Sequence, residues 1–248
     1  SGIEWIGHLP KHWKVEKMKF SFKFRKGLTI TKADLVDNGE AVVNYGQIHS
    51  KHNNGIHISN ELIKRVPASY LETDEYAVCN NQDIIFADTS EDYEGIGNCV
   101  YNDFKGLIFA GYHTIIARNC NTKLNPKYCS YLFYTDGWRS HLRSNASGIK
   151  VFSITQKLLS TALVLIPGED EQQRIASYLD SKCSKIDDII EKQQSVIEKL
   201  KAYKQSIITE AVTKGLNPDV PMKDSGVDWI GKVPKYWKVK KLKYVGKF

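Results

Sequence analysis

Two stretches of this chain, residues 41–60 and 137–168, contain no acidic residue and are rich in polar side chains of the kinds that contact nucleic acids. A polyanionic duplex favours such surfaces, because carboxylates would repel its phosphates. Amides such as Gln47 and Asn53 can form paired hydrogen bonds with the edge of adenine, whereas Lys51 can contact guanine or a phosphate. Both stretches are therefore candidate DNA-contacting segments.

Two further pairs of loop residues, one after the N-terminal segment and one in an acidic stretch, extend the candidate set. Arg139 and Arg143 lie four positions apart on a predicted helix, so their guanidinium groups share a face that can lie along a sugar–phosphate backbone. Each candidate also has a plainer interpretation, because clusters of Asn, His and Gly commonly form solvated turns. The candidate DNA-binding residues are Thr31, Lys32, Gln47, His49, Ser50, Lys51, His52, Asn53, Asn54, Thr89, Ser90, Arg139, Arg143, Asn145, Ser147 and Lys150.

Short β-rich runs separated by Gly, Asn, Asp and Pro predict a mixed α+β domain that positions these residues. One helix is predicted over residues 126–142, where bulky side chains recur at helical spacing. His113 follows Gly111 and Tyr112 beside a β-rich run, and we interpret it as a packed or strand-end histidine. The expected strands are residues 41–43, 83–86, 107–109, 114–116 and 163–166.

A long helix is predicted after this domain, because residues 169–214 contain neither Gly nor Pro. Asp170 lies three residues before Gln173, as in a capping box, and an acidic first turn complements the helix dipole. Gly215 and Pro218 end the stretch. At a rise of about 1.5 Å per residue, such a helix is roughly 65 Å long.

The apolar side chains of this helix follow a heptad rhythm of alternating steps of four and three, which keeps one seam turned toward a partner helix in a coiled coil. Ile189 and Tyr203 lie beside the seam and widen it, so more than one surface is expected to be covered. The alternative is that the helix packs only on its own domain. The seam residues expected to contact a partner helix are Leu179, Ile186, Ile190, Ile197, Leu200 and Ile207.

The chain repeats its first 20 residues at 225–244, with identity at 12 of 20 aligned positions. A period this long does not suit a solenoid of small repeats and indicates two large equivalent halves. We expect both copies to dock into similar pockets through Trp5 and Trp229 and through Trp13 and Trp237. The expected domains are an N-terminal arm (1–26), a recognition domain (27–168), the long helix (169–215), and a linker with the second copy of the arm (216–248).

The net charge of +7 comes from the arms, since residues 1–26 carry +5, residues 225–248 carry +6 and the residues between them sum to −4. DNA binding by the central part must therefore depend on local segments. The five cysteines form no CxxC pair and do not cluster with His, which favours a reducing, cytoplasmic location and no metal. We expect no membrane span and no signal peptide.

Catalysis by the chain is not expected, because the sequence has neither a cofactor-binding glycine motif nor a GxxxxGK[ST] loop. Three segments, WIGHLPKHWKVEKMK, LVLIPGEDEQQRIASYLD and LKAYKQSIITEAVTKGLNP, resemble the DNA-specificity (S) subunit of Type I restriction-modification enzymes. The resemblance implies a target-recognition domain that reads one part of a split DNA target, followed by a long helix. It also implies double-stranded DNA and methyltransferase (M) subunits as partners, and restriction (R) subunits through the latter.

The sequence departs from that family in holding one recognition domain and only the opening segment of a second repeat. One explanation is a half-length subunit that forms a homodimer through antiparallel long helices, which restores two-fold symmetry. The other is a truncated product or fragment. The competing function is a truncated coiled-coil assembly or inhibitor protein that binds methyltransferase subunits without productive DNA recognition. A self-contained nuclease or methyltransferase is a third hypothesis, and it predicts turnover by the isolated chain.

Overall fold

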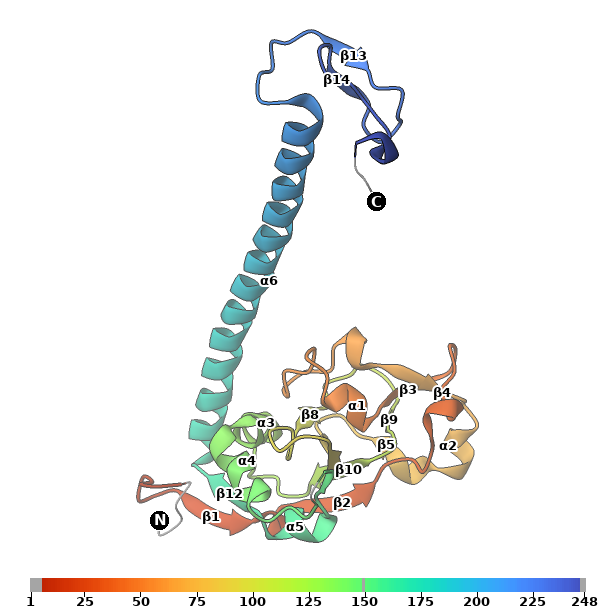
Figure 1. Cartoon of the computed structure of the whole chain (residues 1–248). Helices are drawn as coiled ribbons and strands as arrows, with labels where there is room; N and C mark the ends of the chain where they lie inside the picture. The colour runs from red at the N-terminus through yellow and green to blue at the C-terminus, as the bar shows by residue number, and fades with distance from the viewer. Residues whose placement is uncertain (1–5, 149, 246–248) are drawn as a thin grey trace. The chain divides into compact units, whose positions relative to one another are not determined.

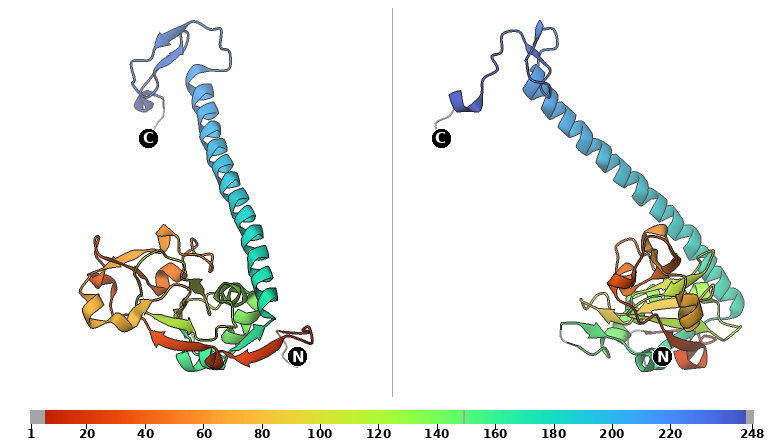
Figure 2. Two further views of the ribbon diagram at one scale, coloured as in Figure 1. Left: turned by 180° about the vertical axis from the view of Figure 1, so that it is seen from behind. Right: turned by 90° about the vertical axis from the view of Figure 1, so that its right-hand side faces the viewer.

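The computed structural model describes residues 6–148 and 150–245 of the chain. The chain divides into two compact units, Ser1–Ser181 and Lys182–Phe248. Helix α6 (Glu169–Lys214) begins in the first unit and continues without a break into the second (Figures 1 and 2).

Two four-stranded sheets form the centre of the first unit. The first has the order β2-β10-β6-β8 and is antiparallel, whereas the second has the order β4-β3-β9-β5 and contains the parallel pair β3–β9. The first sheet consists of β2 (Phe22–Lys26), β6 (Ile84–Ala87), β8 (Cys99–Tyr101) and β10 (Thr114–Asn119). The second consists of β3 (Glu40–Val43), β4 (Lys64–Val66), β5 (Val78–Cys79) and β9 (Ile108–Ala110).

Short ladders and helices complete the first unit. The antiparallel pairs are β1 (Lys14–Lys17) with β12 (Leu163–Ile166), and β7 (Thr89–Ser90) with β11 (Phe152–Ser153). The short helices are α1 (Tyr45–Ile48), α2 (Tyr70–Thr73) and α5 (Gln156–Thr161), with 3-10 turns at Met18–Phe20, Lys32–Asp34, Asn60–Leu62 and Glu75–Ala77. The five predicted strands overlap β3, β6, β9, β10 and β12, so the prediction of a mixed domain followed by a long helix is confirmed.

The helix predicted over residues 126–142 is in fact two helices, α3 (Pro126–Tyr134) and α4 (Asp136–Arg143). Thr135 separates them in an extended conformation, at φ −67° and ψ 141°. Its side chain accepts the N–H of Trp138 and so caps α4, while its own N–H donates to Leu132 O at the end of α3. The break turns Trp138 into the core beside α3.

The main core cluster gathers around Trp138, which is fully buried. Its ring lies 4.4 Å from that of Phe133 and 5.8 Å from that of Phe86, measured between centroids. The indole Nε1 donates to Leu163 O at 2.8 Å, so its polar atom is satisfied as burial requires. Burial in the same cluster raises the pKa of Cys99 to about 12, which keeps this thiol neutral.

A nearly buried ion pair joins the two sheets. Arg118 on β10 donates from Nη2 to Asp83 at 2.7 Å and to Val78 O on β5 at 3.2 Å. The hydrogen bond that Arg118 donates to Asp83 raises the pKa of Arg118, and Asp83 is 2% exposed. The ion pair connects Asp83, the residue before β6, to β10 of the first sheet, and Arg118 also contacts β5 of the second sheet.

Replacing Asp83 by Ala is expected to destabilise the chain by about 2–3 kcal/mol, because it leaves a partly buried guanidinium without its carboxylate. The urea midpoint of unfolding measures this change. Asp37→Ala is the matched control, since Asp37 is an exposed carboxylate. Equal midpoints for the two variants would contradict the structural role of the pair.

Helix α6 begins one residue before the predicted cap. The N–H groups of Glu171 and Gln172 both donate to Gly168 O, so Asp170 lies inside the first turn and the capping box at Asp170 is wrong. Three acids occupy that turn, as the helix dipole favours. Glu171 accepts from Trp13 Nε1 at 3.0 Å and pairs with His12, and the His12 bond lowers the pKa of Glu171. This carboxylate anchors the first arm.

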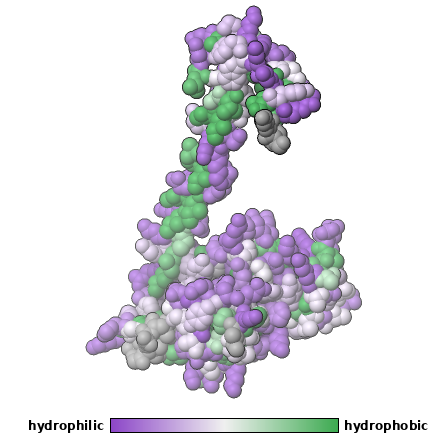
Figure 3. All heavy atoms as spheres, viewed as in Figure 1, coloured by the Kyte–Doolittle hydropathy of each residue, from purple (hydrophilic) through white to green (hydrophobic). Residues whose placement is uncertain are grey.

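The second unit contains most of α6 and a two-stranded ladder, β13 (Met222–Asp224) with β14 (Lys232–Pro234), followed by a 3-10 turn at Leu242–Tyr244. Gly215 follows α6 with φ 79°, a left-handed conformation that suits glycine at a helix end. Among the seam residues, Ile186, Ile190 and Leu200 are 54–60% exposed. Figure 3 shows apolar side chains gathered along α6.

The two copies of the repeated segment make different contacts in their units. In the first copy Trp13 is anchored on α6 and the next residues form β1, whereas Trp229 of the second copy is 80% exposed. Trp237 lies against Gly215 instead. The expectation of similar pockets is therefore wrong for the pair Trp13 and Trp237, because the described part of the second unit has no counterpart of β12. The pair Trp5 and Trp229 is untested, since Trp5 lies outside the described residues.

Candidate nucleic-acid interface

Three candidate segments that are distant in the sequence meet in the first unit. The imidazole of His49, at the end of α1, donates from Nε2 to Thr89 O at 2.8 Å. Strand β7 (Thr89–Ser90) pairs with β11, which lies in the second acid-free stretch. These contacts bring together three segments: residues 41–60, the Thr89 loop and residues 137–168. We call the polar surface that they form the junction cluster.

His49 acts in this cluster by holding its neighbours. Thr89 O can only accept a hydrogen bond, so the proton lies on Nε2, and Nδ1 accepts from the amide of Asn98 at 3.0 Å. Both ring nitrogens are thereby used within the protein. His49 therefore holds Thr89 and Asn98 in place, and neither of its ring nitrogens is left to contact a base.

Arg139 and Arg143 face the protein and not a backbone of DNA. The guanidinium of Arg143 is 7% exposed, pairs with Asp136 at 2.6 Å and donates to Glu94 O at 3.0 Å. Arg139 donates to Glu94 O and Ile96 O, and burial followed by the charge of Arg143 lowers the pKa of Arg139. The shared face was predicted correctly, but it clamps the loop before β8, so the phosphate contact is not supported.

Most amides of the first stretch are also used locally. Asn53 donates to Ile48 O and Cys99 O and accepts from Gly55 N, so both the nitrogen and the oxygen of its side-chain amide are engaged. Gln47, Ser50 and Asn54 each accept a hydrogen bond from the same stretch of chain. Lys51 and His52 are exposed at the loop tip, and no contact of the Lys51 ammonium lies within the described residues.

The remaining candidate residues differ in whether they contact the junction cluster. Asn145 caps its own helix by donating to His141 O, Ser147 forms a bridge with Ser153 of β11, and Lys150 is exposed. Thr31 donates its N–H and hydroxyl to Asp34, and these bonds lower the pKa of Asp34. Within the described residues, no contact joins Thr31 or Lys32 to the junction cluster.

A hollow of about 280 Å³ lies at the cluster. Carboxylates on its wall make it a poor phosphate site, because they would repel an anion. Its lining includes His49, Ser50, Asn53, Asp92, Glu94, Asn98 and Arg139.

A family model described as "Type I restriction modification DNA specificity domain" matches residues 10–199. The chain belongs to this family. Sequence relatives of the specificity domain include the Type I restriction enzyme EcoBI specificity subunit of Escherichia coli, 25% identical over 56% of this chain, and the MjaVIII specificity subunit of Methanocaldococcus jannaschii, 31% identical over 46% of it. The chain spans only 32% and 26% of their lengths. Both relatives are specificity subunits, in agreement with the expected non-catalytic role.

Solved structures share the fold of this specificity domain. A chain from a type I R-M system superposes with a TM-score of 0.60 at 18% identity, over 85% of this chain and 48% of its own length. The HsdS subunit from Thermoanaerobacter tengcongensis gives a TM-score of 0.52 at 18% identity, over 85% of this chain and 47% of that one. The chain therefore spans about half the length of these structures.

Four residues around the junction cluster were not among the sequence candidates: Tyr45, Asp88, Asn98 and Tyr112. A fifth, His113, was interpreted as a packed or strand-end histidine; it is at a strand end, as predicted, and its side chain is 57% exposed. Its Nδ1 lies 3.2 Å from Asp88 Oδ1. The sequence signal for this site was Gly111 between two β-rich runs, since glycine is typical of tight turns.

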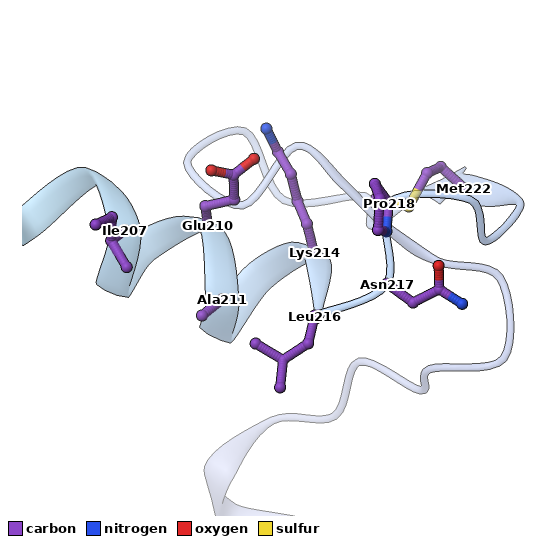
Figure 4. A pocket seen from close by; sticks show the side chains of 9 residues that line it. Ile207, Glu210, Ala211, Lys214, Leu216, Asn217, Pro218 and Met222 are labelled. Atoms are coloured by element: carbon purple, nitrogen blue, oxygen red, sulfur yellow. The ribbon is translucent and has the colours of Figure 1, made fainter. Parts of the chain in front are cut away.

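A separate hollow of about 450 Å³ lies in the second unit, at the C-terminal end of α6 (Figure 4). It is lined by Ile207, Glu210, Ala211, Lys214, Gly215, Leu216, Asn217, Pro218 and Met222. Leu216 is 92% exposed, so the rim is apolar. Within the described residues no helix is long and apolar enough to cross a membrane, and no group of His, Cys and acidic side chains could hold a metal.

Proposed function

We propose that the chain is a sequence-specific DNA-binding specificity subunit that reads one half of a bipartite target and docks methyltransferase subunits. The observation that carries this proposal is the junction cluster, where the two acid-free stretches meet the Thr89 loop through the His49–Thr89 hydrogen bond and the β7–β11 pair. Family membership supports the same role. Action on cellular DNA implies a cytoplasmic protein.

The chain contributes recognition and leaves methyl transfer to its partners. Positioning residues such as His49 and Arg143 give the surface a defined shape, and exposed side chains at the loop tip then contact the duplex. Restriction subunits would join through the methyltransferase subunits. A methyl donor and ATP accordingly bind elsewhere in the assembly, and this chain needs no cofactor.

The exposed seam of α6 supports a partner helix. Ile190 is 60% and Leu200 is 59% exposed, and a helix of 46 residues is about 69 Å long. An apolar stripe of that length is covered in stable proteins. We assign the partner as the α6 of a second copy in an antiparallel coiled coil, which would pair two recognition domains on a two-fold target.

The same seam favours the second candidate, an assembly or inhibitor protein that binds methyltransferase subunits without DNA recognition. The two functions differ in one measurable property. Duplexes selected from a random pool by the chain and its methyltransferase subunits, at about 0.15 M salt, should share a split sequence motif under the first proposal. A tight complex with methyltransferase subunits and no shared motif would establish the inhibitor.

Lys51→Ala is expected to weaken binding to all duplexes uniformly, because a flexible ammonium at an exposed loop tip contacts phosphate. The slope of log affinity against log salt should fall by about 1. Titrations at several salt concentrations measure it. Lys105→Ala is the matched control, since Lys105 is also exposed but lies outside the junction cluster. Loss of preference at one base pair would instead assign Lys51 to a base.

A further inference from the structure

The turn between β9 and β10 holds His113 in a left-handed backbone conformation, at φ 55°. This region is uncommon for residues other than glycine, and residues held in it cluster at functional sites. The side chain of His113 is nevertheless 57% exposed, so burial of the ring does not explain the conformation. The turn presents an imidazole to solvent at an energetic cost.

The residues around the turn hold it rigidly. A Cβ at Gly111 would lie 1.8 Å from Asn44 Oδ1, so only glycine fits there. Asn44 is fully buried, and its Oδ1 accepts the N–H of Tyr112 at 3.2 Å. Thr114 Oγ1 closes the turn by donating to Gly111 O at 2.6 Å. A side chain carried on this turn is therefore preorganised.

The ring of His113 is also fixed. Its Nδ1 lies 3.2 Å from Asp88 Oδ1, and the hydroxyl of Thr89 donates to the same oxygen at 2.7 Å. A carboxylate can only accept, so Nδ1 carries a proton, and in the neutral imidazole Nε2 then keeps a lone pair. Tyr45 packs edge-on against the ring, with centroids 5.4 Å apart. Within the described residues Nε2 has no hydrogen-bond partner.

His113 borders the junction cluster through Thr89. The carbonyl of Thr89 accepts from His49, and its hydroxyl lies 3.3 Å from His113 Nδ1. The polar surface assigned to DNA therefore continues onto the turn.

An unprotonated Nε2 can only accept a hydrogen bond. Its ligand must therefore supply a hydrogen-bond donor, whereas phosphate oxygens are acceptors. The donors that duplex DNA presents in its major groove are the exocyclic amino groups of adenine and cytosine. We infer that His113 is a specificity-determining residue that accepts from such an amino group, with Asp88 and Tyr45 as its positioning residues. This inference rests on the proposed function.

The test compares motifs selected from a random duplex pool by the full chain with its methyltransferase subunits. His113→Gly removes the ring while keeping the positive φ without strain. The variant should retain the motif but lose about tenfold of its preference at one adenine- or cytosine-containing position. His113→Asn also tolerates the backbone conformation and is too short to reach the same atom, so it should give the same loss. His12→Ala is the control, because His12 is an exposed, carboxylate-bonded histidine of the arm.

Each other outcome has a definite meaning. Uniform weakening with a reduced salt dependence would overturn the inference by assigning the ring to phosphate. An unchanged motif in both His113 variants would also overturn it. A wild-type chain that enriches no motif refutes the proposed function itself, which is a different result from an unchanged motif.

Discussion

The substitutions Ile186→Asp, Ile190→Asp and Ile197→Asp together are expected to abolish the proposed self-association of the chain while the recognition domain stays folded. The three side chains lie on the α6 seam and are 45–60% exposed. Covering one isoleucine in a dimer contributes at least ~1 kcal/mol, and two-fold symmetry doubles each loss. Three substitutions therefore remove about 6 kcal/mol, or roughly 10⁴-fold in dissociation constant. Buried carboxylates would add to this loss.

Sedimentation or light scattering measures the effect, since the chain has a mass of 28.2 kDa and a dimer has twice that mass. The matched control places aspartate at Ser184, Ser195 and Ser206, which lie on the opposite face of the same helix and are exposed. The control should remain dimeric. A monomeric wild-type chain would contradict the homodimer, and the seam would then belong to a different partner helix.

Trp138→Ala is expected to destabilise the first unit by about 3–5 kcal/mol, because it opens a large cavity in a close-packed core. Trp138 is fully buried, packs on Phe133 and Phe86, and donates to Leu163 O. A loss of this size is a large fraction of the stability of most domains, which is ~5–15 kcal/mol.

Chemical denaturation followed by circular dichroism measures the change. Trp229→Ala is the matched control, because it deletes the same side chain at a position that is 80% exposed. The control should stay within about 0.5 kcal/mol of the wild type. If both variants unfolded at the same denaturant concentration, the central position of Trp138 in the core would be wrong.

Local chemistry was sufficient to predict five of the strands and the long helix. The runs that became β3, β6, β9, β10 and β12 are β-branched and aromatic, and turn residues bound them. A stretch of 46 residues without Gly or Pro predicted α6, and Gly215 ended it through a left-handed conformation. Such signals act between near neighbours, so the sequence alone carries them.

Tertiary contacts decided where α3 ends. Thr135 is a modest helix former, and residues 126–142 keep helical spacing across it. In the folded chain its hydroxyl caps α4 and Trp138 reaches Phe133. Packing of the indole outweighs the hydrogen bonds of a continuous helix.

For the site, the sequence by itself determined which segments lack acids, which residues can hydrogen bond to bases, and where the long helix carries its seam. Only the tertiary structure decided which of those polar atoms remain available. His49 meets a partner 40 residues away and Arg143 one 49 residues away, and both are used inside the protein. Each donor or acceptor has a limited number of hydrogen bonds, so contacts between distant segments decide which polar atoms, such as the Lys51 ammonium and His113 Nε2, stay available for a ligand.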